Sequence, residues 1–212
     1  MRRSLCLAIL LALTALAPQV ASAQTRTELL DRALLEAGRL REPAQQALAL
    51  AEVAQIAQSL GDARWEKALA DAVAAAGLVE EPIAKAMTWR GLAVRTWPLQ
   101  PELAHPLLDR ALKAARDLPY AAHRSLTLRE IGRSLIELDK SAAPAVFAES
   151  LSAAEGIETP LFRSAALRDL AAAWQPLDAT QSEKLFAEAA AALAGVQPPE
   201  DAVELARVEL IV

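Results

Sequence analysis

The sequence predicts an all-α fold, a right-handed α-solenoid of about five helical hairpins. Two observations predict it. From residue 47 onward the chain repeats every 39 residues without insertion or deletion, and the four copies begin at Ala47, Ala86, Ser125 and Ser164. Within each copy, apolar residues recur at spacings of three and four, which is the period of a helix and not of a strand. A fixed period of this length is typical of solenoids, whose core lies between neighbouring repeats.

The first 23 residues have the features of a secretory signal peptide. Arg2 and Arg3 precede an almost wholly apolar run at 5–16, and Ala21-Ser22-Ala23 supplies a small-residue cleavage site. A transmembrane anchor is the alternative, but the run is shorter than the about 20 residues that span a bilayer. No second apolar run follows. We therefore expect a periplasmic or secreted protein with no stable membrane insertion after signal cleavage.

Composition narrows the classes of protein further. Cys6 is the only cysteine and lies in the signal, so the mature chain has neither a disulfide nor thiolate chemistry. Without Arg2 and Arg3, 20 basic residues face 27 acidic ones. This acidic balance argues against a general nucleic-acid binder. Arginine outnumbers lysine and asparagine is absent, a composition that suggests a GC-rich bacterial genome.

Each repeat is predicted to be a hairpin of two amphipathic helices. The apolar stripe of the first helix begins with Leu50 and Val53, and its copies follow at the same period. A polar or proline break comes next, and then a second amphipathic stretch. A turn closes the repeat, and one column of prolines follows it: Pro43, Pro82, Pro160 and Pro199. Proline suits the first turn of a helix, where its missing N–H costs nothing.

The phase of the repeat suggests the domain organisation. The stretch that begins at Thr27 aligns with the second helix of later repeats, as in the run from His105. Counted from the predicted cleavage site, the mature chain forms one solenoid of five units. These units are residues 24–62, 63–101, 102–140, 141–179 and a short 180–212.

The first-helix columns resemble those of the tetratricopeptide repeat. That family has a large residue, leucine, a small residue and a large residue at the spacings of Leu128, Ile131, Gly132 and Leu135. The other repeats have the same columns, except that Ala57 and Thr96 stand where the family has an aromatic residue. The column Ala75, Ala114, Ala153 and Ala192 resembles its small second-helix position. The usual period is 34 residues, five fewer than here. HEAT-like repeats, with periods of roughly 40 to 47, are the rival, and Phe162 to Leu167 resembles their second-helix opening.

One column of arginines is the feature most open to a functional interpretation. Arg90, Arg129, Arg168 and Arg207 lie 39 residues apart, and Arg133 follows Arg129 by one helical turn. Equivalent positions of a solenoid stack along one face. The resemblance implies that this face is the concave groove. An unpaired basic track there would bind a carboxylate-rich partner. In the alternative, each arginine pairs with an acid of its own or the next repeat.

The same resemblance places further side chains in the groove. They are Leu48, Met87, Leu126, Gln55, Val94, Gln58, Trp97 and Ile136. Trp97 precedes Pro98 at the end of a helix, so it is a candidate partner-binding anchor, and core packing is the alternative. Trp89 and Trp174 fall in stripe columns and are expected in the core, and Trp65 is expected to pack at the start of a helix.

Catalysis has little support in the sequence. His105 and His123 form no metal spacing, and no G-x-S-x-G or glycine-rich phosphate loop is present. We expect no enzyme, cofactor or metal, and a protein or peptide partner, acidic if the arginines bind it. The expected role is that of an adaptor or scaffold in the cell envelope. The alternatives are an envelope enzyme or its accessory helical domain, and a self-associating structural spacer.

The C-terminus is the last predicted feature. The chain ends on Val208, Leu210, Ile211 and Val212 without a capping helix. Solenoids need a polar outer face on the terminal repeat. We therefore expect a second copy or a partner to cover this end.

Overall fold

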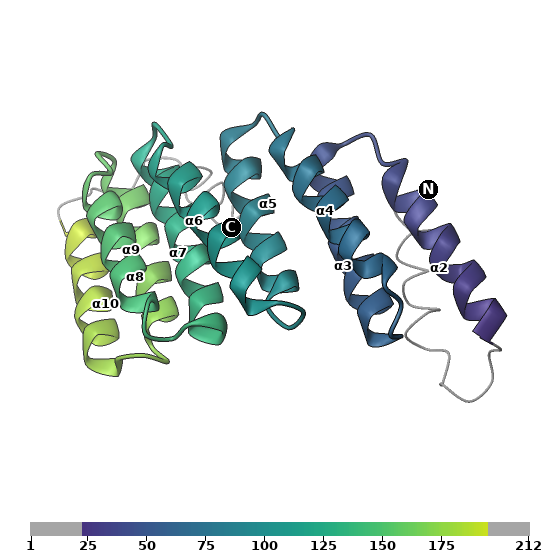
Figure 1. The fold of residues 1–212 in the computed structure, drawn as a ribbon. Coiled ribbons are helices and arrows are strands. Elements are labelled where there is room, and N and C mark those ends of the chain that lie inside the picture. Colours follow the sequence, from purple (N-terminus) through teal and green to yellow (C-terminus); the bar gives the residue numbers. More distant parts are fainter. Residues whose placement is uncertain (1–22, 195–212) are drawn as a thin grey trace.

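The computed structural model describes residues 23–194, and every regular element in that range is a helix. The helices follow one another along the molecule, with α2 at one end and α10 at the other (Figure 1). Their bounds are α2 Ala23–Gly38, α3 Pro43–Ser59, α4 Arg64–Gly77, α5 Pro82–Thr96, α6 Pro101–Arg116, α7 Ala121–Leu138, α8 Ala143–Glu155, α9 Pro160–Trp174 and α10 Ala179–Leu193. The predicted all-α solenoid arrangement is confirmed.

The helices pack as antiparallel pairs. The most extensive contacts join α3 to α4, α5 to α6, α7 to α8, and α9 to α10. We name the first member of each pair an A helix (α3, α5, α7, α9) and the second a B helix (α4, α6, α8, α10). Successive A helices contact each other, whereas successive B helices contact each other little or not at all. The A helices are therefore the more closely spaced row, and the solenoid curves toward them.

The repeat units can be placed on this packing. The tight pairs divide 43–193 into four hairpins, and α2 precedes them as a single helix that packs on α3. The units counted from residue 24 instead group each second helix with the A helix that follows it. Of the predicted signal segment only Ala23, where α2 begins, lies among the described residues. The predicted C-terminal stripe and its cover lie outside them.

Three A helices begin as the proline column predicts. Pro43, Pro82 and Pro160 each occupy the first turn of their helix. The remaining A helix, α7, begins at Ala121, two residues after Pro119. The polar breaks are also confirmed as the turns between A and B helices. Gly61 is the described residue with a positive φ, 70°, at the turn from α3 to α4. Most side chains cannot adopt that backbone conformation without strain.

The core follows the predicted columns. The large first-helix position is buried in all four hairpins, at most 5% exposed, in Leu50, Trp89, Leu128 and Leu167. The small position is fully buried at Ala54, Ala93 and Ala171. At Gly132 a Cβ would lie 2.5 Å from Cδ1 of Phe147. Phe147 is itself fully buried and packs its ring on that of Trp174, 5.3 Å away.

The two helices of a hairpin cross at small residues. Ser150 on α8 donates a hydrogen bond of 2.8 Å to the backbone oxygen of Ser125 on α7, and Ser164 on α9 bonds in the same way to Ala189 on α10. The first two hairpins place alanine at all four equivalent positions, and each is 0% exposed: Ala47, Ala72, Ala86 and Ala111. The predicted second-helix column, Ala75, Ala114, Ala153 and Ala192, lies one turn further on and is only partly buried at Ala114 and Ala192. The hydrogen-bonded contacts between the two helices therefore lie one turn before this column.

The tryptophans expected in the core take the predicted positions. Trp89 is 5% exposed, and the guanidinium carbon of Arg110 lies 4.9 Å from the centre of its ring. Trp65 and Trp174 are half-buried and pack against the same core. Across residues 23–194, no helix is both long and apolar enough to cross a bilayer.

Candidate functional site

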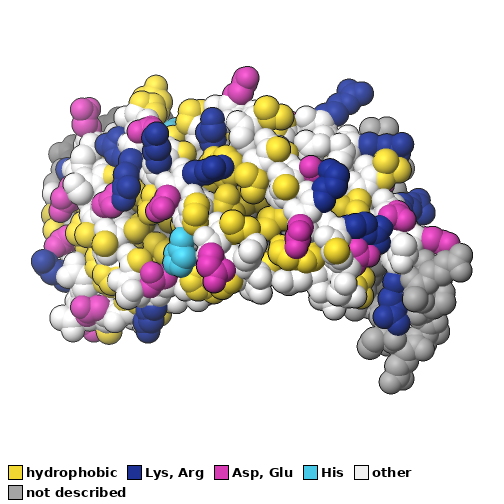
Figure 2. Space-filling model, viewed as in Figure 1, with side chains coloured by type: hydrophobic (Ala, Val, Ile, Leu, Met, Phe, Trp, Pro, Cys, Tyr) yellow, Lys and Arg dark blue, Asp and Glu magenta, His cyan; other side chains and the backbone are white. Residues whose placement is uncertain are grey.

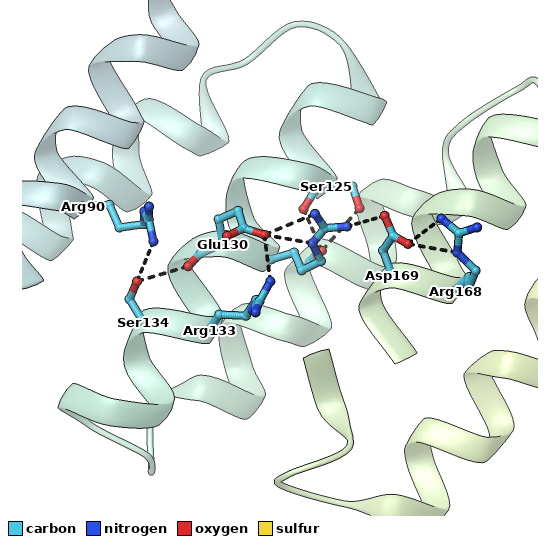
Figure 3. A network of polar contacts seen from close by, with 9 residues as sticks. Arg90, Ser125, Glu130, Arg133, Ser134, Arg168 and Asp169 are labelled. Carbon is cyan, nitrogen blue, oxygen red and sulfur yellow. Dashed lines mark hydrogen bonds and ion pairs between the residues drawn. The ribbon is translucent and has the colours of Figure 1, made fainter. Parts of the chain in front are cut away.

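The arginine column lies on the A helices. Arg90 is on α5, Arg129 on α7 and Arg168 on α9, at equivalent positions, and we call these three the arginine row. Arg207 lies outside the described residues. Figure 3 shows polar contacts running across these three helices. The face drawn in Figure 2 has acidic side chains among the basic ones, and hydrophobic side chains gather in its middle.

Arg129 and Arg168 are paired with carboxylates. Arg129, whose side chain is 14% exposed, donates from Nη1 to Asp169 of the next A helix at 2.9 Å, and from Nε and Nη2 to Glu130 at 3.3 and 3.2 Å. Arg168 donates to Asp169 from Nε and Nη2, at 3.0 and 2.9 Å. These two members of the row therefore follow the alternative interpretation, in which they bind acids of the protein itself. Neighbouring residues of a helix point apart, but the long arginine stem curls back to reach the adjacent carboxylate.

Arg133 extends the network toward solvent. Its Nη1 lies 3.7 Å from Oε1 of Glu130, and its side chain is 61% exposed. Glu130 is therefore shared by Arg129 and Arg133, and its contact with Arg133 is the longer one, 3.7 Å against 3.2 Å. Arg133 is more exposed than Arg168, at 61% against 55%, and is therefore open to solvent.

Arg90 differs from the rest of the row because no described carboxylate bonds to it. Its Nη1 donates to Oγ of Ser134 on α7 at 2.9 Å, while its Nε is enclosed and has no hydrogen-bond partner among residues 23–194. Burial lowers the pKa of Arg90, and the positive charges of Arg95 and Arg133 lower it further, against an opposing effect of Glu130. The protein thus holds a partly buried, incompletely bonded cation beside two others.

The neighbouring column explains the difference. In the arginine row, Arg129 and Arg168 are each followed by an acid, Glu130 or Asp169, whereas Arg90 is followed by Gly91. A Cβ at Gly91 would lie 2.7 Å from Cδ2 of Leu48, which packs there from α3. The side chain of Leu48 therefore occupies the space beside α5 that corresponds to the carboxylate position of α7 and α9.

Two glutamines expected in the groove have a structural role instead. Gln55 donates from Nε2 to the backbone oxygen of Arg95 at 2.9 Å, and Gln58 donates to that of Leu99 at 3.3 Å. Gln55 thus bonds a carbonyl in the last turn of α5, where a helix leaves acceptors unsatisfied, and Gln58 bonds a carbonyl in the turn that follows the helix. Arg95 itself was missed by the sequence analysis, because its column holds Ile56, Ser134 and Ala173 in the other A helices and gives no repeat signal.

Trp97 lies at the end of α5 against α6. Its ring meets that of His105 edge-on, with centroids 5.1 Å apart, and the residue is half-buried. Trp97 is therefore partly packed against the protein and partly exposed to solvent, so its burial lies between that of a core residue and that of an exposed binding anchor. Of the other apolar residues expected in the groove, Leu126 on α7 is 44% exposed, while the rest are half-buried.

A groove of about 500 Å³ lies between α7 and α9 beside the arginine row. Polar and apolar groups line it together, among them Arg129, Arg133, Ile136, Asp169 and Ala172. Among the described residues, no group of three histidines, cysteines, aspartates or glutamates is placed to hold a metal ion. His105 and His123 are both exposed, the latter edge-on to Tyr120.

Comparisons with known proteins show a similarity in fold alone. No protein-family model and no curated protein matches the sequence. The crystal structure of Ton1535 from Thermococcus onnurineus NA1 is similar in fold, with a TM-score of 0.51 at 13% sequence identity. The match covers 89% of this chain and 68% of that one.

The two paired arginines are expected to differ in their effect on stability. Arg129→Gln leaves Glu130 and Asp169 facing each other without their shared cation, so the free energy of unfolding should fall by about 1–2 kcal/mol. Arg168→Gln should change it by less than about 1 kcal/mol, because Arg168 is 55% exposed and Asp169 keeps Arg129. Urea denaturation of both variants measures the difference, and equal effects would contradict the assigned network.

Proposed function

We propose that this protein is an exported helical-repeat adaptor or scaffold of the bacterial cell envelope, which binds a protein or peptide partner along the concave face of its A helices. The observation that carries the proposal is the arginines of that face, where no described carboxylate bonds to Arg90 and the exposed Arg133 shares Glu130 with Arg129. The groove beside Arg129 and Arg133 and the exposed Leu126 add polar and apolar contact surface to it. Acidic segments of a partner are the natural ligands of such a face.

Paired variants test this function. Arg133→Gln/Arg168→Gln removes the two exposed charges of the A-helix face, at 61% and 55% exposure, and leaves Arg129 paired with Asp169. Lys67→Gln/Lys113→Gln removes the same charge from exposed positions on the B helices. Each is expressed with residues 1–23 attached, so that recovery from the periplasm of a chain beginning at Gln24 also tests export.

The expected result concerns proteins captured from the periplasm by the immobilised protein. Proteins bound by the wild type should be retained by the B-helix variant, lost by the A-helix variant and released by salt, because exposed charges are screened. Identical capture by both variants, or capture that salt does not affect, argues against binding on the A-helix face. No capture by the wild type argues against the adaptor function itself.

A further inference from the structure

The guanidinium of Arg90 has more donors than the protein fills. It offers five N–H groups. Ser134 accepts one of them, and Nε is buried without a partner among the described residues. A buried donor left without an acceptor costs more than an ordinary hydrogen bond gains. Arg90 is therefore the member of the row that gains most from an added acceptor.

The repeat itself indicates which acceptor is missing. Arg129 and Arg168 each bond the carboxylate of the residue that follows them, and Arg129 also bonds the carboxylate of the next A helix. For Arg90 the following residue is Gly91, and the carboxylate of the next A helix, Glu130, bonds Arg129 and faces Arg133 instead. Arg90 thus lacks both carboxylates that its position receives in the neighbouring repeat.

The surroundings favour one small anion over a polyanion. Arg95 lies beside the gap at Gly91, because its Nη1 donates to the backbone oxygen of Gly91 at 3.2 Å, and Nη1 of Arg133 lies 3.7 Å from Oε1 of Glu130 on α7. The positive charges of both arginines lower the pKa of Arg90. Glu130 lies beside them, and Glu137 and Asp169 line the groove that follows toward α9. A long run of negative charge would meet these carboxylates, whereas a single carboxylate would meet only the arginines.

We propose that Arg90, Arg95 and Arg133 form a binding site for one carboxylate, the side chain of an aspartate or glutamate of the partner, which supplies the charged acceptor that Arg90 lacks within the protein. This inference rests on the proposed function and names the group that the A-helix face recognises. Since Nε is enclosed, Arg90 turns from Ser134 as the carboxylate binds. One bond to a hydroxyl is then exchanged for two parallel bonds to a charged acceptor.

Titration with acetate tests the site without any partner. The probe is the Nε–H resonance of Arg90, followed by proton–nitrogen NMR at constant ionic strength and assigned by its absence in Arg90→Lys. Acetate should shift this resonance to saturation, and chloride should not. Inorganic phosphate should act less than acetate. No response to acetate, or a larger response to phosphate, overturns the carboxylate site.

A matched pair of variants shows whether the site can be filled from within. Ser134→Asp places a carboxylate beside Nη1 of Arg90, so the acetate-dependent shift should be lost. Ser134→Asn introduces a side chain of the same size as aspartate but without its charge, so the acetate-dependent shift should remain. Equal responses of Ser134→Asp and Ser134→Asn to acetate overturn the proposal. If Ser134→Asp does not fold, the test is instead whether Arg90→Lys loses partner binding.

The outcomes separate this inference from the proposed function. An acetate response in a protein that captures no partner supports the carboxylate site and argues against the adaptor. Capture that is unchanged in Arg90→Lys, yet lost in Arg133→Gln/Arg168→Gln, supports the adaptor and overturns the carboxylate site.

Discussion

Replacing Leu128 with alanine is expected to lower the free energy of unfolding by about 2–5 kcal/mol, the range for a large-to-small change in a packed core. Leu128 is 1% exposed and lies on α7, which packs against α5, α6, α8 and α9. With neighbours on so many sides, the space left by the side chain cannot close by the shift of one helix. In a solenoid, stability is close to the sum of repeat and interface terms, so this loss weakens several interfaces at once.

Leu126→Ala provides the control on the same helix. Leu126 is 44% exposed, so its replacement should cost less than about 1 kcal/mol. Urea denaturation followed by circular dichroism at a helix band compares the two variants. Similar midpoints for both would mean that α7 does not present the face toward the core that the structure assigns to it.

Gly132→Ala is expected to destabilise the protein by about 1–3 kcal/mol, although alanine is the better helix former. In the middle of an exposed helix this change would stabilise by up to about 1 kcal/mol. Here the new methyl group meets the ring of Phe147, which is fully buried and held against Trp174. The ring has no free space to move into, so overpacking outweighs helix propensity.

Two comparisons make the Gly132 result specific. Gly77→Ala, at the end of α4, adds a methyl group with nothing within 4 Å and should be neutral or slightly stabilising. Gly132→Ala combined with Phe147→Leu should lose less stability than the two single changes summed, because the smaller side chain leaves room for the methyl group. Additive losses in thermal unfolding would show that the two residues do not contact each other.

The fold was predictable because the helix starts and the core positions recur with the same 39-residue period. The prolines mark where A helices begin, and the large and small positions near Leu128 and Gly132 recur in register with them. The turn at which the two helices of a hairpin meet was not predicted, since alanine is abundant in the second helices and neighbouring turns both carry it. Only the hydrogen bonds of Ser150 and Ser164 distinguish the true crossing, and these depend on the partner helix.

The candidate site was predicted in part, and for a clear physical reason. The column identified Arg90, Arg129 and Arg168, but it could not tell a paired arginine from an unpaired one. Pairing depends on the reach of a long side chain around its own helix and across to the next. The exception at Gly91 is visible in the sequence as a gap in the acidic column. Arg95 has no counterpart in other repeats, so only the structure reveals that it lies beside Gly91 and acts on Arg90.

The joints between successive A helices differ in their chemistry along the molecule. From α3 to α5 they are neutral side-chain amides that bond backbone oxygens, through Gln55 and Gln58. From α7 to α9 the joint is ionic, between Arg129 and Asp169. Salt screens the attraction between charges, whereas hydrogen bonds donated by neutral side-chain amides are largely unaffected by it. The contact between α7 and α9 is therefore expected to weaken as the ionic strength rises, whereas the contact between α3 and α5 should change little.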